Sequence, residues 1–379
     1  MTTAEGACPA LLTVEPDDAL CSCDMGVWVQ PPKCSRQDIR HAGRVLIGKE
    51  DGDYAGAVGL ISAWRAAHAF PLNTFQVVLR RRAQKVLPTS VVTQRLKRLE
   101  TIRVKLERFY PHMVLAGMQD IGGCRAIVAS VSQLNELRAR YQPDVMAPHE
   151  FRREKDYIAS PKADGYRAYH VVYRYKSESV EQEPWNGLEI EVQMRSIRQH
   201  AWASAVETVD FFAKQKIKSG ISEGEWAQFF TLFGNSIAEM ENQPLAANVS
   251  SGEELRRELR EVADSLRVIK NLRAWARARH VLSLTDTKGA KFFLVQLDTD
   301  SMKVTVTGFS QKRQQAAQAA YTLAEKAVAL HPGRQAVLVG AESVAELRRA
   351  YASFVVEPKV FIDILTGALK GKRVEMTGA

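Results

Sequence analysis

Apolar side chains recur at helical spacing in two segments near the start of the chain. In residues 35–47 the apolar positions follow Ser35, which stands three residues ahead of Asp38, the arrangement of a helix N-cap. Residues 54–69 show the same spacing, and Pro71 is expected to end that helix because proline interrupts the helical hydrogen-bond ladder. Two helices are therefore predicted ahead of the first strand.

Residues 91–109 combine apolar positions at helical spacing with six basic side chains between them. This spacing predicts one amphipathic helix with an apolar side and a basic remainder. The apolar positions are Val92, Leu96, Leu99, Ile102, Leu106 and Phe109.

Three short apolar runs, residues 124–131, 171–175 and 188–194, have the character of β-strands. The last alternates apolar and polar positions in the way that a half-buried strand does. Because strands and helices alternate here, the expected fold is α/β, with a mixed β-sheet flanked by helices.

The second half of the chain predicts helices first and then a small α/β module. The module contains a hairpin over residues 292–307, a helix over 311–330 and a strand over 336–339. We therefore expect four segments: a flexible tail (1–34), a main α/β domain (35–220), a helical connector (221–275) and a C-terminal α/β module (276–379).

The charge balance favours a polyanionic partner. The 379 residues include 52 Lys and Arg against 43 Asp and Glu, a formal net charge of +9, which suits nucleotide phosphate or RNA, although many basic proteins bind neither. There is no run of about 18 apolar residues, so we expect a cytoplasmic protein with no membrane partner. Four of the five cysteines lie within the first 34 residues without the paired spacing of a zinc site, and we expect reduced thiols there.

The first candidate for chemistry is the segment D-I-G-G-C-R, from Asp120 to Arg125. A carboxylate at the mouth of a sheet can hold Mg²⁺, glycines let phosphate oxygens approach the backbone, and an arginine can neutralise them. The alternative is an ordinary Asp-Gly turn ahead of a strand.

The second candidate interleaves cations and aromatic side chains around a proline and a glycine. It contains Lys155, Tyr157, Lys162, Tyr166 and His170. Such a segment can stack a base on a tyrosine while its cations hold phosphates, although any single tyrosine beside a strand is more often part of the core.

The third candidate is the polar side of residues 188–195. In a strand, Glu191 shares one face with Gln193 and Arg195. Glu191 can then bind a metal ion or accept a proton. Standing alone, this polar face would be the solvated side of an edge strand.

In this order and at these separations, the three segments resemble the synthetase domain of the RelA/SpoT family. The resemblance implies a nucleotidyltransferase-like synthetase domain over residues 35–220, with an ATP-clasping element at residues 95–105. The family spacing R-x-K-x-x-x-S-x-x-x-K is met with threonine in place of serine, by Arg95, Lys97, Thr101 and Lys105. Asp120 corresponds to the metal-binding aspartate of the family and Arg125 to its phosphate-binding arginine.

The same resemblance assigns the acceptor side. R-E-K-D at residues 153–156 corresponds to the acceptor-selectivity motif, and Lys155 and Tyr157 to acceptor-binding positions. Tyr166 would stack on the acceptor purine, and Lys162 and His170 would contact its phosphates. Glu191 would bind Mg²⁺ and activate the 3′-hydroxyl, with Gln193 and Arg195 beside it. Two departures from the family pattern, Asp164 for Asn and Ala168 for Ser, bear on acceptor contacts.

The implied activity is an ATP-dependent, Mg²⁺-requiring pyrophosphokinase acting on a ribose 3′-hydroxyl. Two acceptors stay open: GDP or GTP, giving the alarmones ppGpp and pppGpp, or the 3′ end of tRNA, giving a translation-blocking toxin. A catalytically dead binding module is disfavoured because every charged catalytic position is filled. The chain has no H-D-x-x-E-D motif, so no hydrolase domain is expected.

The C-terminal layout is similar to CapRel-like fused toxin–antitoxin proteins of phage defence. In those proteins a Tyr-x-x-Tyr segment is implied to plug the catalytic site until a phage protein binds. Here the two positions are Tyr351 and Phe354, so the second ring lacks its hydroxyl. The alternative is an accessory folding or oligomerisation domain.

Overall fold

A computed structural model describes residues 28–212, 224–284, 289–301, 303–329, 334–340 and 358–371. No helix in these ranges is both long and apolar enough to cross a membrane. The segment before the first helix is already part of the fold, because the Trp185 indole donates a hydrogen bond of 3.0 Å to the carbonyl of Val29. Of the expected tail, residues 1–27 lie outside the described ranges.

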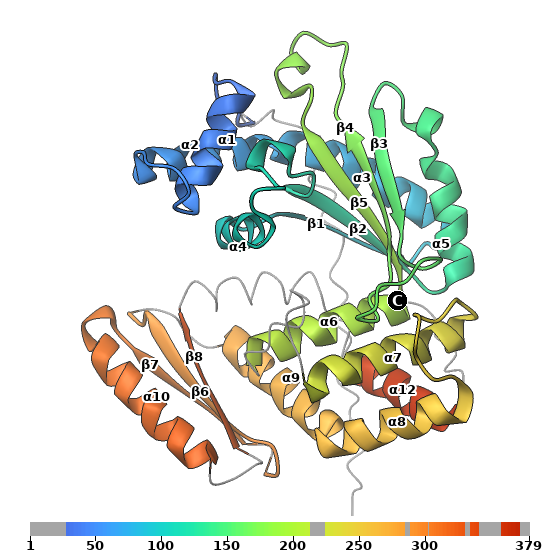
Figure 1. Cartoon of the computed structure of the whole chain (residues 1–379), viewed down its shortest axis with the longest axis vertical. Helices are drawn as coiled ribbons and strands as arrows, with labels where there is room; N and C mark the ends of the chain where they lie inside the picture. The colour runs from blue at the N-terminus through green and yellow to red at the C-terminus, as the bar shows by residue number, and fades with distance from the viewer. Residues whose placement is uncertain are drawn as a thin grey trace, which may run out of the picture.

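The main unit is built on a five-stranded sheet in the order β1-β2-β5-β4-β3 (Figure 1). β2 and β5 run parallel, whereas the other neighbouring pairs are antiparallel, which confirms the expected mixed sheet. The strands are β1 (Val91–Leu96), β2 (Gly122–Val128), β3 (Glu150–Asp156), β4 (Tyr169–Arg174) and β5 (Glu189–Ser196).

Helices cover one face of this sheet. The apolar positions of β2, β4 and β5 form a buried core with α3 (Ala69–Val86) and α5 (Val131–Arg138). A smaller core joins α1 (Arg36–Leu46), α2 (Tyr54–Ala67) and α4 (Leu99–Phe109). The other face of the sheet, which carries the polar positions, is therefore available for a site. Short 3₁₀ turns occur at Leu115–Gly117, Ala139–Tyr141, Pro143–Met146, Glu183–Trp185 and Gln311–Arg313.

A layer of helices lies below the sheet in Figure 1. Its core is aromatic and includes Phe229, Phe233, Trp275 and Phe361. Phe361 belongs to the last helix, so the C-terminal segment returns to this layer and does not stay with the preceding module. The helices are α6 (Ile197–Phe212), α7 (Glu225–Glu241), α8 (Gly252–Ser265), α9 (Val268–Leu284) and α12 (Pro358–Lys370).

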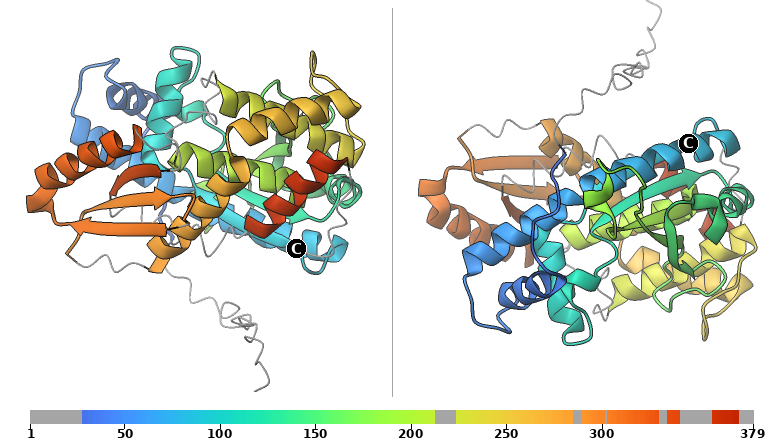
Figure 2. Two further views of the ribbon diagram at one scale, coloured as in Figure 1. Left: turned by 90° about the horizontal axis from the view of Figure 1, so that it is seen from below. Right: turned by 90° about the horizontal axis from the view of Figure 1, so that it is seen from above.

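Residues 292–340 include a second, smaller sheet with a helix packed on it. Three antiparallel strands in the order β7-β6-β8 pack against α10 (Gln314–Ala329), and α9 lies along the same sheet (Figure 2). The strands are β6 (Phe292–Asp298), β7 (Lys303–Phe309) and β8 (Arg334–Gly340).

Three expectations about elements were wrong or incomplete. Residues 91–109 are not one helix, because β1 pairs with β2 over residues 91–96 and α4 begins only at Leu99. Pro71 does not end a helix but lies in the first turn of α3, where its missing N–H has no helical partner to lose. The helices expected at the start of the second half of the chain include α8 and α9, which are separated at Arg267, where a φ of +49° is incompatible with a right-handed helix. The capping box at Ser35 and Asp38, in contrast, is confirmed.

Candidate active site

The polar face of the sheet aligns its side chains in rows because residues paired directly across strands point to the same side. One row crosses all five strands, and it runs from the edge strand β3 to β1 through Lys155, His170, Gln193, Arg125 and Thr93. The neighbouring row places Glu191 next to Gly123 and Arg95. β5 is thus a central strand, and the interpretation of its polar side as a solvated edge is wrong.

Asp120 lies just before β2 and is held by two lysines. Its Oδ2 accepts hydrogen bonds from Nζ of Lys97 at 2.6 Å and Nζ of Lys105 at 2.8 Å. Burial alone would raise the pKa of Asp120, but the two ammonium groups outweigh it and hold the pKa below its ordinary value. Asp120 is therefore ionised, and the turn before β2 is a charged site.

The residues around Asp120 fit a divalent cation. Oδ1 of Asp120 is buried and has no hydrogen-bond partner within the described ranges, although its carboxylate is charged. Glu191 lines the same pocket and is close enough to oppose the ionisation of Asp120. Mg²⁺ is commonly bound by one or two carboxylates together with substrate phosphates, so these two residues suffice as its protein ligands. The pocket is lined by Thr93, Gln94, Arg95, Lys97, Asp120, Gly123, Cys124, Arg125, Glu191 and Gln193.

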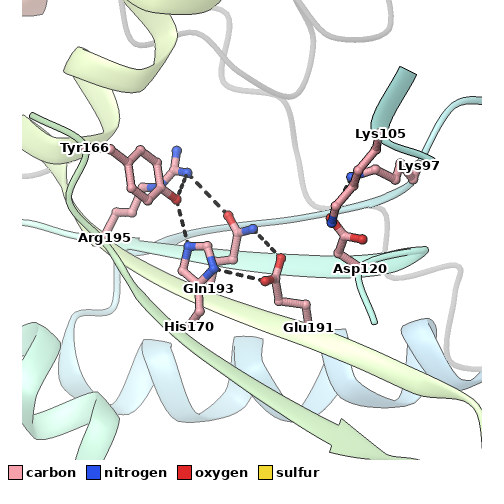
Figure 3. A network of polar contacts seen from close by, with 8 residues as sticks. All are labelled: Lys97, Lys105, Asp120, Tyr166, His170, Glu191, Gln193 and Arg195. Carbon is pink, nitrogen blue, oxygen red and sulfur yellow. Dashed lines mark hydrogen bonds and ion pairs between the residues drawn. The ribbon is translucent and has the colours of Figure 1, made fainter. Parts of the chain in front are cut away.

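Next to this pocket, five side chains form a closed ring of hydrogen bonds (Figure 3). Nη2 of Arg195 donates to the Tyr166 hydroxyl at 2.7 Å, and that hydroxyl lies 2.7 Å from Nε2 of His170. Nδ1 of His170 lies 2.9 Å from Oε1 of Glu191. Nε2 of Gln193 donates to Oε2 of Glu191 at 2.6 Å, and Arg195 closes the ring at 3.4 Å from Oε1 of Gln193.

The order of donors in the ring is fixed by Arg195, because a guanidinium only donates. The Tyr166 hydroxyl accepts from Arg195 and can give its own hydrogen to Nε2 of His170, which assigns the remaining imidazole hydrogen to Nδ1. Nδ1 then donates to Glu191. Burial disfavours the charged carboxylate, but His170 and then Gln193 hold the pKa of Glu191 far below its ordinary value. Glu191 is therefore an ionised, firmly oriented carboxylate.

The Tyr166 ring lies under two cations. Nζ of Lys162 is 4.9 Å from its centroid and Cζ of Arg195 is 5.2 Å from it, and Trp202 and Tyr157 contact it edge-on at 6.0 and 5.7 Å. These contacts surround the ring on which an acceptor purine is expected to stack. Of the two cations, Arg195 lies on β5 and Lys162 lies in the loop between β3 and β4.

Arg125 adds a cation from β2 to the lining of the pocket. It is buried, and Nη1 lies 3.3 Å from Nδ1 of His200 in α6. Burial, together with the charge of Arg195, lowers the pKa of Arg125 to about 9, so it remains a cation at neutral pH. Burial and the two arginines hold the pKa of His200 well below its ordinary value, which leaves that imidazole neutral and able to accept from Arg125.

Comparison with known proteins gives this part of the chain a family. Residues 94–215 match the family model described as the region found in RelA / SpoT proteins. These residues form a RelA/SpoT region. The GTP pyrophosphokinase YjbM of Bacillus subtilis is 29% identical over 127 residues, which are 33% of this chain and 57% of that protein. The chain thus spans little more than half the length of this curated relative.

Solved structures also resemble the chain. A GTP pyrophosphokinase family protein from Streptococcus pneumoniae aligns with a TM-score of 0.36 and 24% identity, over 45% of this chain and 84% of that one. The small alarmone synthetase 1 of Bacillus subtilis, bound to its product pppGpp, aligns with a TM-score of 0.39 and 22% identity, over 45% and 88%.

The RelA/SpoT region brings most of the predicted site residues together. Six of them line one pocket: Arg95, Lys97, Asp120, Arg125, Glu191 and Gln193. Lys105 joins them through Asp120, and Tyr166, His170 and Arg195 through the ring of hydrogen bonds. Thr101 is exposed on α4 and is not among the residues that line the pocket. Tyr351 and Phe354 lie outside the described residues.

His170 has a different environment from the one expected of a phosphate ligand. It bridges Tyr166 and Glu191 and so belongs to the machinery around the carboxylate. Sequence reasoning gave no role to His200, Trp202 or Arg167. Trp202 covers the Tyr166 ring and anchors to α7, its indole donating to the carbonyl of Phe230 at 2.8 Å. The aromatic cluster at residues 229–233 was the one available signal that this helix packs on the RelA/SpoT region.

Proposed function

We propose that the chain is an ATP-dependent pyrophosphokinase that transfers pyrophosphate to the ribose 3′-hydroxyl of GDP or GTP, giving ppGpp or pppGpp. The observation that supports this most is the pairing of two ionised carboxylates, Asp120 and Glu191, in one pocket lined with cations inside a RelA/SpoT region. The name of the curated relative, a GTP pyrophosphokinase, points to the same acceptor.

The transfer needs positioning and charge neutralisation more than reactive groups. Arg95, Lys97, Lys105 and Arg125 would hold the triphosphate of ATP against β1 and β2. Mg²⁺, when bound by Asp120 and Glu191, supplies further neutralisation of the phosphate charge. ATP would thus be fixed with its β-phosphorus facing β5.

The acceptor would approach from the β4 side of the sheet. Tyr166 would stack on the purine, and Glu191 would take the proton of the 3′-hydroxyl. The 3′ oxygen then bonds to the β-phosphorus of ATP while the bond from that phosphorus to the oxygen bridging the α-phosphate breaks, and AMP leaves. The contact of Glu191 with His170 keeps the accepting carboxylate aimed at the pocket.

The test is incubation of the purified full chain with Mg²⁺ and ATP labelled on the γ-phosphate, offering GDP, GTP or deacylated tRNA in parallel. Label in ppGpp or pppGpp is the expected result. If neither the folded protein nor its Tyr351→Ala variant gave labelled product with any acceptor, the proposed chemistry would be refuted.

The carboxylate that carries the proposal can be tested against a matched neighbour. Glu191→Gln should lower kcat at least about 100-fold, because an amide neither takes the proton nor binds a cation. Glu189 lies two residues away on the same strand but pairs with Arg174 at 3.0 Å, and Glu189→Gln should retain transfer within a few-fold. If kcat fell equally in the two variants, the loss would come from a general disturbance of β5 and not from removal of the Glu191 carboxylate.

A second candidate acceptor is the 3′ end of tRNA. Arg153 and Lys155 are exposed on the edge strand β3 next to the proposed purine site, and the chain is basic overall, which favours a long polyanion. Label on tRNA alone would select this acceptor and would make the enzyme a translation-blocking toxin of the phage-defence type. In that case we propose the C-terminal module as its inhibitor and a phage protein as its trigger.

A further inference from the structure

Arg167 directly follows Tyr166 and is almost fully buried, at 2% exposure. Its guanidinium joins the β3–β4 loop, residues 157–168, to helix α7. Nε donates to the carbonyl of Gly234 at 3.2 Å and Nη2 to Oδ1 of Asn235 at 3.2 Å, while Nη1 reaches the carbonyl of Ile158 at 3.4 Å. One side chain therefore connects the beginning of the loop, its end and the helix.

The backbones of the loop and the helix touch at two glycines. A Cβ on Gly234 would lie 2.4 Å from the carbonyl oxygen of Gly165, and a Cβ on Gly165 would lie 2.7 Å from the carbonyl oxygen of Phe230. Gly165 also has a φ of +84°, which side chains rarely adopt. The approach is therefore closer than any pair of larger residues would permit.

Asn235, whose side-chain oxygen accepts the hydrogen bond from Arg167, is itself held by two further hydrogen bonds. Its Nδ2 donates to the carbonyl of Thr231 at 2.8 Å, and its Oδ1 also accepts from the backbone N–H of Ala246 at 2.7 Å. The Arg167 contact is thus made with a rigid part of α7 and its following loop, and not with a mobile side chain.

Burying a guanidinium among mainly neutral partners costs desolvation free energy, which an apolar side chain in the same place would not cost. Burial lowers the pKa of Arg167 to about 10, against the charge of Glu241, so the group stays charged and its desolvation opposes folding. Packing alone would be served by an apolar side chain. Unlike an apolar side chain, arginine donates several hydrogen bonds in the fixed plane of its guanidinium, and these bonds hold the loop in one orientation.

We propose that Arg167 is a positioning residue that locks the β3–β4 loop onto α7 and so holds Tyr166 where it can receive the acceptor base. The inference rests on the proposed function for the identity of what Tyr166 binds. It assigns part of the acceptor site to a helix, Glu225–Glu241, that lies beyond the RelA/SpoT region of residues 94–215.

The test compares wild-type protein with Arg167→Lys, which keeps the charge but loses the fork. The KM for the acceptor should rise at least fivefold while the KM for ATP changes less than twofold, because the ATP-side cations lie on β1, β2 and α4. A smaller rise, or an equal rise in both KM values, would overturn the proposal. Arg36→Lys is the matched control, since Arg36 also donates to a backbone carbonyl, that of Ala116 at 3.3 Å, but does so between α1 and the 3₁₀ turn Leu115–Gly117. It should leave both KM values unchanged.

A measurement without nucleotides separates this inference from the proposed function. Amide hydrogen exchange of residues 157–168 should be at least tenfold faster in Arg167→Lys than in wild type, with β5 unchanged. If no transfer is found with any acceptor but exchange becomes faster, Arg167 does hold the loop on α7 and only the proposed pyrophosphokinase reaction is refuted. If exchange does not rise, the lock is wrong whatever the activity. Should Arg167→Lys not fold, Gly234→Ala takes its place, because the added Cβ must push Gly165 away and should give the same two results.

Discussion

Asp120 and Glu191 remain charged by different means, although both side chains are largely removed from water. Asp120 is neutralised by two ammonium groups, which also occupy one of its oxygens. Glu191 receives directed hydrogen bonds from His170 and Gln193, and these contacts hold its pKa below the ordinary value although burial opposes them. A buried carboxylate without such partners would be protonated. Both environments therefore keep the carboxylate anionic, which is the form that a divalent cation requires.

Asp120→Asn should lower kcat at least about 100-fold, since an amide neither binds a cation well nor compensates the two lysines. The melting temperature should fall by only a few degrees because the side chain keeps its shape. Steady-state kinetics and thermal unfolding measure the two effects. Asp51→Asn, at an exposed carboxylate in the loop between α1 and α2, is the control and should change neither. An Asp120→Asn enzyme with near-normal kcat would remove Asp120 from the site.

Tyr166→Phe separates the ring from the hydroxyl. The phenylalanine can still stack on a purine but no longer links Arg195 to His170, so kcat/KM should fall about tenfold, against at least about 100-fold for Tyr166→Ala. Tyr175→Phe, which loses a bond of 3.0 Å to Gln182 away from the pocket, should behave as wild type. A normal Tyr166→Phe enzyme would show that the hydroxyl contacts are incidental.

At the scale of elements, the alternation of apolar and polar residues predicted β5 correctly. Its side chains point in turn to the buried core and to the polar face that carries the candidate site. The same reasoning failed at residues 91–96, since Val92 and Leu96 are four apart and satisfy both helical spacing and one face of a strand. Pairing with β2, which is 30 residues away, decides between the two. Local spacing carries no information about that partner.

The edge strand β3 had no apolar signal at all, because six of its seven residues are charged. Its pairing with β4 rests on backbone hydrogen bonds, and its exposed charges suit an edge that must not pair further. The contact of the β3–β4 loop with α7 was equally beyond prediction, as it joins Gly165 to a residue 69 positions later. The chemical groups of the site were thus predictable from the sequence, whereas the elements that hold them in place were only partly so.

The strand assignment of residues 91–96 has a direct test. Val92 packs against the core under α3, while Thr93 lines the pocket on the opposite face. Val92→Lys should therefore cost about 1–3 kcal/mol of unfolding free energy in urea, and Thr93→Lys much less. The opposite order would contradict the register of β1.

At the scale of the whole molecule, the C-terminal segment and the proposed acceptor site share one helix. The Phe361 ring of α12 lies 5.1 Å from that of Phe233 in α7, and the next residue, Gly234, touches the β3–β4 loop. A change in how α12 packs on α7 would therefore shift α7, and through α7 the β3–β4 loop. This arrangement supports the proposal that the C-terminal module regulates transfer.

Tyr351→Ala tests the regulatory proposal. If the segment before α12 blocks the site, the variant should transfer pyrophosphate faster in vitro and arrest growth more strongly on expression, because the ring that plugs the site is gone. Tyr54→Ala, at a tyrosine that is 57% exposed on α2, should do neither. Unchanged transfer and growth in Tyr351→Ala would leave the module as an accessory folding domain.

The contact between Gly165 and Gly234 also bears on how such enzymes are assembled over evolution. A recombination event that joined a new partner domain directly after residue 215 would transfer the whole RelA/SpoT region but leave behind the surface on which its loop rests. In this chain the structural unit around the candidate site is therefore longer than the matched region and extends through α7. A domain joined beyond that helix would leave the contact between the loop and α7 intact.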